Sequence, residues 1–438
     1  MSKDKKDLKR VAGNSAWMII AKVINIVIGL AVSVYVTRYL GAESKGMMAN
    51  AQAISGFWGF IAACGLADIL ISKFSKEREV SGKIATSGMI IMLCGGTIAF
   101  LLSICSAIVL NTGSKVAVYV AIFASVYLFQ FFSVFEYWFY SNSISKYFAI
   151  AQSCVHIFFL IVRFIGVPLG AGLLYFVLAS VLETVFVFVS MFFCYKKSKC
   201  SYVGQMQIDR KMIKSIFIEA LPMIAMGFAT TIYMKVDQIV VGKMLGNTEL
   251  GLYSVAVTLA EYWYFIPGVV YSSFLPILAA SDKSEYKDKL QKFADIMVLL
   301  GYVAAFGVMV FGEWGIGFLY GEEFKKSAYI LMVYIWSGIF TCLSYSGQAV
   351  YIINKDTKIV MWINIVGAVL NLLLNIVFIQ WMGSIGAAFA TLLEYMMVAF
   401  GQMVVLWKRY SELYIIQLKA LIPFKRLFMY AEQYIRNK

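Results

Sequence analysis

The sequence predicts an all-α polytopic membrane protein, and its composition and its long apolar runs both support this fold class. Of its 438 residues, 61% are hydrophobic and only 14% are charged, and the mean hydropathy is +0.79. A soluble domain of this length cannot bury so much apolar surface, whereas a membrane protein exposes it to lipid. The runs lack the alternating pattern of a β-barrel, so we expect helices, which satisfy their own backbone hydrogen bonds in lipid.

Span lengths divide the chain into two halves. A helix rises about 1.5 Å per residue, so a hydrocarbon core about 30 Å thick needs roughly 20 apolar residues. By that rule we expect about twelve transmembrane helices, at residues 14–37, 47–72, 84–110, 116–140, 147–168, 171–195, 215–241, 251–279, 293–318, 328–353, 359–381 and 384–407. This gives an N-terminal six-helix lobe (1–195), a cytoplasmic linker (196–214), a C-terminal six-helix lobe (215–407) and a basic amphipathic cytoplasmic tail (408–438). We expect the tail to lie on the inner membrane surface.

The positive charges orient these spans. With the N-terminus in the cytoplasm, 29 of the 38 Lys and Arg residues fall on cytoplasmic segments and six on outer segments. Positive residues concentrate on cytoplasmic loops of membrane proteins, so this bias predicts that both termini are cytoplasmic. It also explains the net charge of +14 without nucleic acid.

A short outer turn occurs twice, and the two copies are 205 residues apart. "TRYLGAESKGMMANAQA" (37–53) aligns with "GKMLGNTELGLYSVAVT" (242–258), so that Arg38 matches Lys243 and Gly41 matches Gly246. The copies are six spans apart, so both halves cross the membrane in the same direction. This is a parallel repeat, for which we expect a substrate path through a central cavity between the lobes. Arg38 and Lys243 would lie at its outer gate, where they meet the exiting substrate or the lipid headgroups.

Polar side chains inside the spans are the candidate substrate-binding residues, because such groups are costly in lipid and usually face protein or water. Helical phase gives one polar stripe to each of five spans, although hydroxyl and amide stripes also bond helices to one another. Arg163 cannot be deprotonated, so inside a span it must be paired or face water. The candidates are Lys22, Asn25, Arg163, Lys235, Ser344, Gln348 and Asn371.

Acidic side chains in or near the spans offer either proton or sodium coupling or structural salt bridges. The candidates are Asp68, Glu219, Asp237 and Glu261. Seven cysteines, mostly within apolar runs, and a single histidine do not form a zinc site. We therefore expect neither a metal nor a cofactor.

Enzyme motifs are absent from the sequence. "GAESKG" has the spacing of a phosphate-binding loop, but Met47 and Met48 replace the required Lys and Ser or Thr. There is no G-x-S-x-G or H-E-x-x-H motif, so we expect a protein that is not an enzyme. The aromatic run "FQFFSVFEYWFY" (129–140) either stacks on sugar rings or packs against helices and lipid, with Trp138 in an interfacial belt.

Several segments resemble the polysaccharide-transporter (Wzx-type) flippases of the multidrug/oligosaccharidyl-lipid/polysaccharide (MOP) exporter superfamily. They are "TRYLGAESKG", "VDQIVVGKMLGNTELGLYSVA", "AEYWYFIP", "FLYGEEFKKSA" and "GSIGAAFATLLEY", in this order. The resemblance runs from the first span to about residue 407. It implies two lobes that open alternately, and a cargo of undecaprenyl-diphosphate-linked oligosaccharide moved to the outer leaflet of the bacterial cytoplasmic membrane for capsule, O-antigen or exopolysaccharide assembly. Polysaccharide polymerase and assembly proteins are then the expected partners, beside membrane lipids.

Two other functions compete with this one. A multidrug exporter of the same superfamily should prefer an acidic cavity suited to organic cations, and the cations Lys22 and Arg163 of the first lobe disfavour it. A membrane polysaccharide polymerase would need a large outer loop with catalytic residues, and the predicted outer loops are all short.

Overall fold

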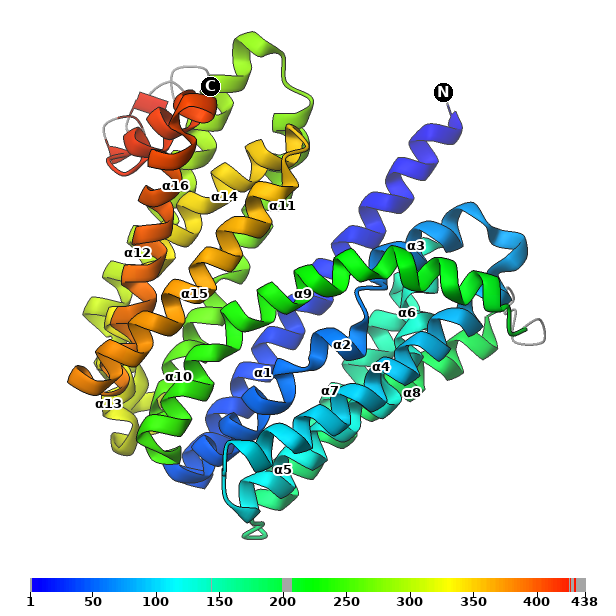
Figure 1. The fold of residues 1–438 in the computed structure, drawn as a ribbon, viewed down its shortest axis with the longest axis vertical. Coiled ribbons are helices and arrows are strands. Elements are labelled where there is room, and N and C mark those ends of the chain that lie inside the picture. Colours follow the sequence, from blue (N-terminus) through cyan, green and yellow to red (C-terminus); the bar gives the residue numbers. More distant parts are fainter. Residues whose placement is uncertain (1, 143, 199–206, 425, 427–428, 431–438) are drawn as a thin grey trace. The chain divides into compact units, whose positions relative to one another are not determined.

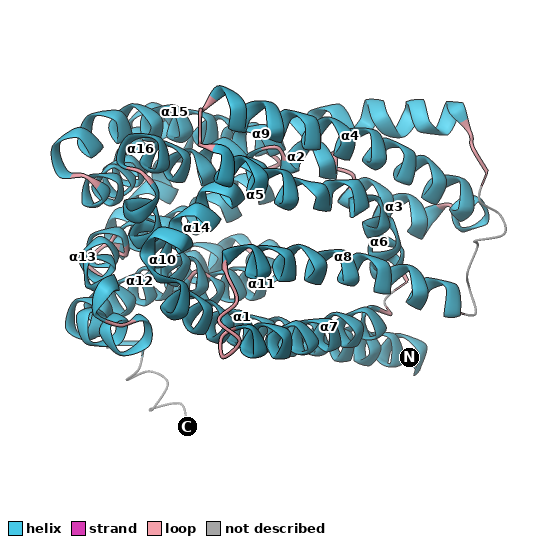
Figure 2. Ribbon diagram, turned by 90° about the horizontal axis from the view of Figure 1, so that it is seen from below, coloured by secondary structure: helices cyan, strands magenta, loops and turns pink. Residues whose placement is uncertain are grey.

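The computed structural model describes residues 2–142, 144–198, 207–424, 426 and 429–430, with the side chains of residues 2–26 and a few others left out. Every regular element in this part of the chain is a helix (Figures 1 and 2). Up to residue 197 these are α1 (Ser2–Phe57), α2 (Gly59–Ala63), α3 (Ala67–Lys76), η1 (Arg78–Val80), α4 (Ser81–Val109), α5 (Ser114–Ala124), η2 (Ser125–Phe132), α6 (Ser133–Ser141), α7 (Ser145–Gly166) and α8 (Leu173–Lys197). Then follow α9 (Arg210–Leu245), α10 (Asn247–Trp263), α11 (Phe265–Ala279), α12 (Lys283–Tyr320), η4 (Glu322–Phe324), α13 (Lys325–Tyr334), α14 (Ser337–Ile353), α15 (Thr357–Met382) and α16 (Ser384–Ala420).

The all-helical membrane fold is confirmed. Nine helices or continuous helix pairs of the described chain are long and apolar enough to cross a membrane, and the bent pair Val27–Phe57 and Gly59–Lys76 makes a tenth. Their outer surfaces carry large apolar side chains, as lipid contact requires. On α12, for example, Val310, Trp314 and Phe318 are 71%, 71% and 67% exposed. The full count of twelve stays a prediction.

The chain divides into two compact units, Met1–Lys235 and Val236–Lys438, and the division falls inside α9. The first part of α9 belongs to the first unit, because Ile216 and Ala220 are buried in that unit's core. The predicted lobe boundaries, with a linker at 196–214, stay a prediction.

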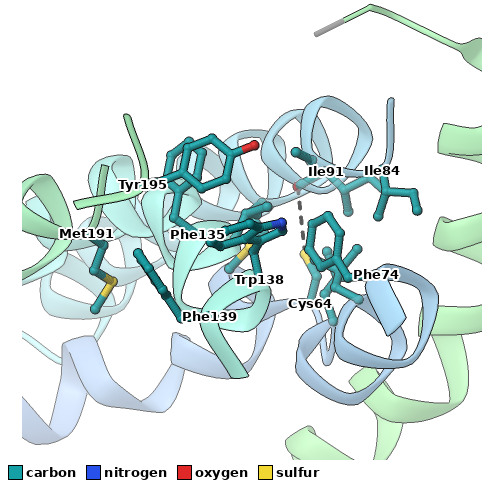
Figure 3. Packing of buried hydrophobic residues seen from close by; sticks show 14 of the residues in the cluster. Cys64, Phe74, Ile84, Ile91, Phe135, Trp138, Phe139, Met191 and Tyr195 are labelled. Carbon is teal, nitrogen blue, oxygen red and sulfur yellow. Dashed lines mark hydrogen bonds between the residues drawn. The ribbon is translucent and has the colours of Figure 1, made fainter. Parts of the chain in front are cut away.

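The aromatic run contributes several side chains to the core of the first unit (Figure 3). Phe135, Trp138 and Phe139 of α6 are buried there beside Tyr195 of α8. The rings of Trp138 and Tyr195 meet edge to face, with centroids 4.9 Å apart. These side chains therefore pack between helices, and the expectation that Trp138 lies in an interfacial belt is wrong because only 3% of it is exposed.

In the second unit, the end of α16 folds against α12 and α14. The helix breaks at Tyr410, whose backbone angles (φ −128°, ψ 30°) are not helical. Beyond the break the Tyr414 hydroxyl lies 2.9 Å from that of Tyr351, and Gln417 Nε2 donates to the Leu343 carbonyl at 3.2 Å. The later residue of α16, Gln417, thus contacts the earlier residue of α14, Leu343, so the end of α16 runs antiparallel to α14. The first part of the predicted tail is thus packed protein.

The duplicated turn has the same backbone conformation in both copies. Gly41 interrupts α1 with φ 76° and ψ 173°, and Gly246 separates α9 from α10 with φ 85° and ψ −178°. Only glycine adopts this region readily, because a Cβ atom would clash with the backbone. The glycines in "YLGAES" and "MLGNTE" are therefore what allows a helix to end and a new one to begin at once.

Gly246→Ala is expected to lower the free energy of unfolding by about 1–3 kcal/mol, the usual cost of holding an L-residue in a glycine-only region. A Cβ at this position would meet no atom within 4 Å, so the whole effect comes from the backbone. The measurement is thermal stability of the purified protein in detergent. Gly315→Ala, at an equally open position inside α12, is the control and should be neutral or slightly stabilising. Equal effects of the two substitutions would show that the turn conformation costs nothing.

Candidate functional site

In the first unit, the sole histidine of the chain, a buried acid and Arg163 form one cluster. His156 and Arg163 lie seven residues apart on α7, which places them two turns apart on one face of the helix. Glu183 projects from α8, which packs along α7 (Figure 1). Its Oε1 atom contacts His156 Nδ1, and its Oε2 atom accepts a hydrogen bond from Arg163 Nη2. Arg163 Nη2 also donates to the Ser180 hydroxyl at 3.2 Å.

This cluster is mostly shielded from solvent. The side chains of Arg163 and Glu183 are each 12% exposed, and that of His156 is 24% exposed. Arg163 lies in the last turn of α7, nearer the helix end than the predicted span 147–168 suggested. Its long side chain reaches back along the helix to Glu183, as side chains in helices do. Removal of either partner would leave a charge in a poorly hydrated place, which is costly.

A second polar cluster lies inside the second unit around Asp237 of α9. This carboxylate is only 6% exposed, and it accepts hydrogen bonds from the backbone N–H of Gln238 at 2.7 Å and the Tyr253 hydroxyl at 2.6 Å. The side chain of Thr391 on α16 lies beside the Tyr253 hydroxyl. Three helices of this unit thus contribute oxygen-bearing side chains to one buried place.

Asn371 and Asn375 of α15 complete this second cluster. Asn375 Nδ2 donates to Asn371 Oδ1 at 2.8 Å, and Asn371 Nδ2 reaches Thr391 Oγ1 at 3.5 Å. The Asn375 Oδ1 atom is buried without a hydrogen-bond partner in the structure. A carboxylate, amide oxygens and hydroxyls are together the ligand types that hard cations prefer.

The other predicted substrate-binding residues are distributed over both units. The side chains of Lys22 and Asn25 lie outside the described residues, although α1 continues through both positions. Lys235 is half-buried, and its Cε atom lies 3.9 Å from the place of a Cβ on Gly56. In the second unit, Ser344 is exposed and Gln348 is half-buried one turn further along α14.

The outer-gate candidates Arg38 and Lys243 are both exposed, each three residues before its turn glycine. The remaining acids differ from Asp237 in being accessible to solvent. Glu219 forms a salt bridge to Lys73 at 2.9 Å, while Asp68 and Glu261 are exposed. Of the four acids proposed for ion coupling, Asp237 alone is buried.

Many membrane-spanning helices together with charged and polar side chains buried between them define the class of protein: a polytopic membrane transporter. The chain belongs to the family described as "Polysaccharide biosynthesis protein", whose model matches residues 11–279, and a MatE family model matches residues 222–377. It is thus a transporter of the MOP superfamily and not an enzyme, as its sequence predicted.

Among curated proteins, a probable low-salt glycan biosynthesis flippase, Agl15 of Haloferax volcanii, is similar to this chain. The two are 24% identical over 168 residues, which cover 37% of this chain and 35% of that protein's length. The chain therefore matches only about a third of this curated relative.

Solved structures share the fold at low sequence identity. An inward-facing multidrug resistance MATE family transporter of the MOP superfamily matches 89% of this chain and 95% of its own, with a TM-score of 0.71 and 14% identity. The lipid II flippase MurJ in an inward closed conformation covers 95% and 92%, with a TM-score of 0.71 and 15% identity. A MOP superfamily transporter from Pyrococcus furiosus covers 93% and 96%, with a TM-score of 0.62 and 13% identity.

Proposed function

We propose that this transporter flips an undecaprenyl-diphosphate-linked oligosaccharide from the inner to the outer leaflet of a bacterial cytoplasmic membrane. The product would serve capsule, O-antigen or exopolysaccharide assembly, and the two lobes would open alternately to each side. The observation that carries the proposal is the Arg163 guanidinium held between α7 and α8 in a member of a polysaccharide biosynthesis family. A planar guanidinium matches the geometry of phosphate oxygens, and it keeps its charge at any physiological pH.

The other candidate residues fit the parts of this cargo. Lys22 and Lys235 supply further positive charge for the diphosphate. Asn25, Ser344, Gln348 and Asn371 supply the amides and hydroxyls with which sugars form hydrogen bonds. Twelve spans with both termini in the cytoplasm would place Arg38 and Lys243 at the outer gate, where diphosphates leave. Polymerase and assembly proteins outside the membrane would then take the product.

The charge of the cargo can contribute to its transport. When two negative charges move outward across a membrane whose inner side is negative by 100 mV, about 4.6 kcal/mol is released, at about 2.3 kcal/mol per charge. Coupling to protons or sodium could add to this, and the buried carboxylate of Asp237 is the acid best placed to take part.

Asp237→Asn is expected to remove any stimulation of transport by an ion gradient. Asparagine has the same shape and accepts the Tyr253 hydrogen bond, but its neutral amide does not take up a proton and offers a cation no negative charge. The measurement is flipping in proteoliposomes under a sodium gradient, a pH gradient or neither, which also identifies the ion. Glu261→Gln, at an exposed acid, is the control and should respond like the unmodified protein. An undiminished gradient response in Asp237→Asn would exclude this residue as the coupling site.

The function itself is tested in inside-out membrane vesicles that contain the protein and a fluorescent undecaprenyl-diphosphate oligosaccharide. A flippase should move the sugar into the lumen, where added glycosidase cannot reach it. Vesicles without the protein give the background. Equal protection in both preparations would contradict the proposal.

A multidrug exporter is the second candidate, because the MatE model matches residues 222–377 and Asp237 is a buried acid of the kind that organic cations require. Export of ethidium by the same proteoliposomes, without protection of the lipid-linked sugar, would favour this function.

A further inference from the structure

Glu183 holds Arg163 on one side and His156 on the other, and this arrangement has a consequence for substrate binding. We infer that the Glu183–His156 pair takes up one proton when the anionic group of a substrate binds Arg163. The inference rests on the proposed function, in which that group is a diphosphate. It assigns roles to Glu183 and His156, which act on the substrate through Arg163 and are therefore positioning residues.

The two oxygens of Glu183 are divided between the two partners. Oε2 accepts from the Arg163 guanidinium, while Oε1 contacts Nδ1 of the imidazole. An ionised carboxylate only accepts hydrogen bonds, so the imidazole must carry its hydrogen on Nδ1. In the neutral form of this tautomer the other nitrogen, Nε2, has a lone pair to which a proton can be added.

While no substrate is bound, the positive charge of Arg163 compensates the negative charge of Glu183. A diphosphate has the stronger and more highly charged acceptors, and it competes for the same guanidinium N–H groups. Once the guanidinium N–H groups of Arg163 bind the diphosphate, the carboxylate of Glu183, which is only 12% exposed, would have only a neutral histidine beside it. An uncompensated charge in such a place is strongly destabilising.

Protonation of His156 removes this cost. A proton from solvent adds to Nε2, and the resulting imidazolium keeps its Nδ1–H directed at Glu183. The side chain is 24% exposed, twice the exposure of its two partners, so water can deliver the proton. Histidine is also the side chain that gains a proton most readily near neutral pH.

Further charges on the neighbouring helices set the field around the pair. Glu136 of α6 is paired by a 2.8 Å hydrogen bond from Tyr140. Lys22 lies outside the described side chains. The charged residues at positions 3–10 of α1 also lie outside the described side chains, and those on α1 and α5 whose side chains are described are Arg38, Glu43, Lys45 and Lys115. Arg38, Glu43 and Lys45 are within four residues of the turn glycine Gly41, and Lys115 begins α5, so all four belong to helix ends.

The test measures proton uptake directly. Farnesyl diphosphate, which carries a free diphosphate on a short isoprenoid chain, is titrated into the purified full-length protein by calorimetry. The titration is repeated in two buffers of different ionisation enthalpy, and the difference in heat gives the number of protons exchanged. We expect an uptake of about one proton at pH 7.5. Because protons are taken up on binding, affinity should rise up to about tenfold per unit as pH falls from 8 to 6.

His156→Gln is the matched variant, since glutamine can still donate to Glu183 but does not titrate in this range. It should bind with no uptake beyond that of the diphosphate itself, and with a flatter pH dependence. Equal uptake in both proteins, or none in the unmodified protein, would overturn the inference while leaving the flippase proposal intact. Absence of any binding to the unmodified protein would overturn both. Should His156→Gln fail to fold, absence of uptake by the unmodified protein in the two-buffer measurement would still overturn the inference.

Discussion

Arg163→Gln is expected to slow flipping of the lipid-linked oligosaccharide by up to about 100-fold. Glutamine keeps two N–H donors but loses the positive charge, and a hydrogen bond to a charged group contributes up to about 3 kcal/mol. At about 1.4 kcal/mol for each factor of ten, this amounts to about 100-fold. The measurement is the rate of sugar protection in inside-out vesicles, normalised to the amount of protein in the membrane.

A structural role for Arg163 must be separated from a role in binding, because the substitution also leaves Glu183 without its cation. The double variant Arg163→Gln with Glu183→Gln removes both charges and should recover most of the stability lost in the single variant. It should still fail to flip the substrate. Arg409→Gln, which removes an arginine whose side chain is 62% exposed, is the control and should transport normally. Normal transport by the double variant would show that Arg163 is needed only for folding.

The membrane-spanning helices could be predicted because their length and apolar character are dictated by lipid. The predicted span 171–195 corresponds to α8, Leu173–Lys197, and the predicted span 359–381 corresponds to α15, Thr357–Met382. The broken helices were harder to predict. The run predicted at 251–279 is divided into α10 and α11 at Tyr264. Pro267, three residues later, lacks the N–H that would bond to the Trp263 carbonyl, but a proline in a span does not by itself show whether the helix kinks or ends.

The candidate sites were predictable only in part. The sequence indicates that Arg163 needs a partner, and an acid inside the next span, Glu183, was the available signal. The sharing of Glu183 with His156 depends on how α7 and α8 face each other, which helical phase within one span does not give. The surroundings of Asp237 were harder to predict, since Asn371 and Thr391 come from helices that are far from Asp237 and Tyr253 in the sequence.

The composition of a segment also does not show whether its side chains are buried in the protein core. An aromatic run of twelve residues suits lipid, sugar and core equally well, and only the neighbouring helices bury Trp138 and Phe139. The basic character of residues 408–438 likewise indicated a surface segment. The structure gives one of those charges, Arg426, a fully buried partner in Asp295 of α12.

Arg426→Ala is expected to lower the free energy of unfolding of the second unit by about 3 kcal/mol, the lower end of the range for breaking a buried ion pair. The guanidinium binds both Asp295 oxygens, with Nε to Oδ2 at 2.9 Å and Nη2 to Oδ1 at 2.8 Å. Asp295 has no exposed surface, whereas Arg426 is 24% exposed. Gln291 at 3.0 Å and Tyr430 at 3.3 Å would still donate to Asp295, which limits the loss.

Three measurements distinguish this pair from an ordinary surface contact. Arg409→Ala breaks the salt bridge to Asp356, in which the side chain of Arg409 is 62% exposed and that of Asp356 is 21% exposed. It should lower the free energy of unfolding by at most about 1 kcal/mol. Asp295→Leu combined with Arg426→Leu leaves no unpaired charge and should recover most of the lost stability. The Asp295 carboxylate raises the pKa of Arg426 further above its usual value, so the pair's contribution should be unchanged between pH 7 and 9.

The same substitution should release the end of α16 from its place in the second unit. Arg426 bonds to the Lys419 carbonyl as well as to Asp295, so it links the residues after α16 both to the end of that helix and to α12. Without it, the described residues after α16 keep only hydrogen bonds with neutral donors to α12, from the Tyr302 hydroxyl to the Leu421 carbonyl at 3.0 Å and from the Tyr430 hydroxyl to Asp295 at 3.3 Å. Carboxypeptidase digestion of inside-out vesicles should therefore proceed further into the chain in Arg426→Ala than in Arg409→Ala. Equal digestion of the two variants would show that the ion pair does not hold this segment in place.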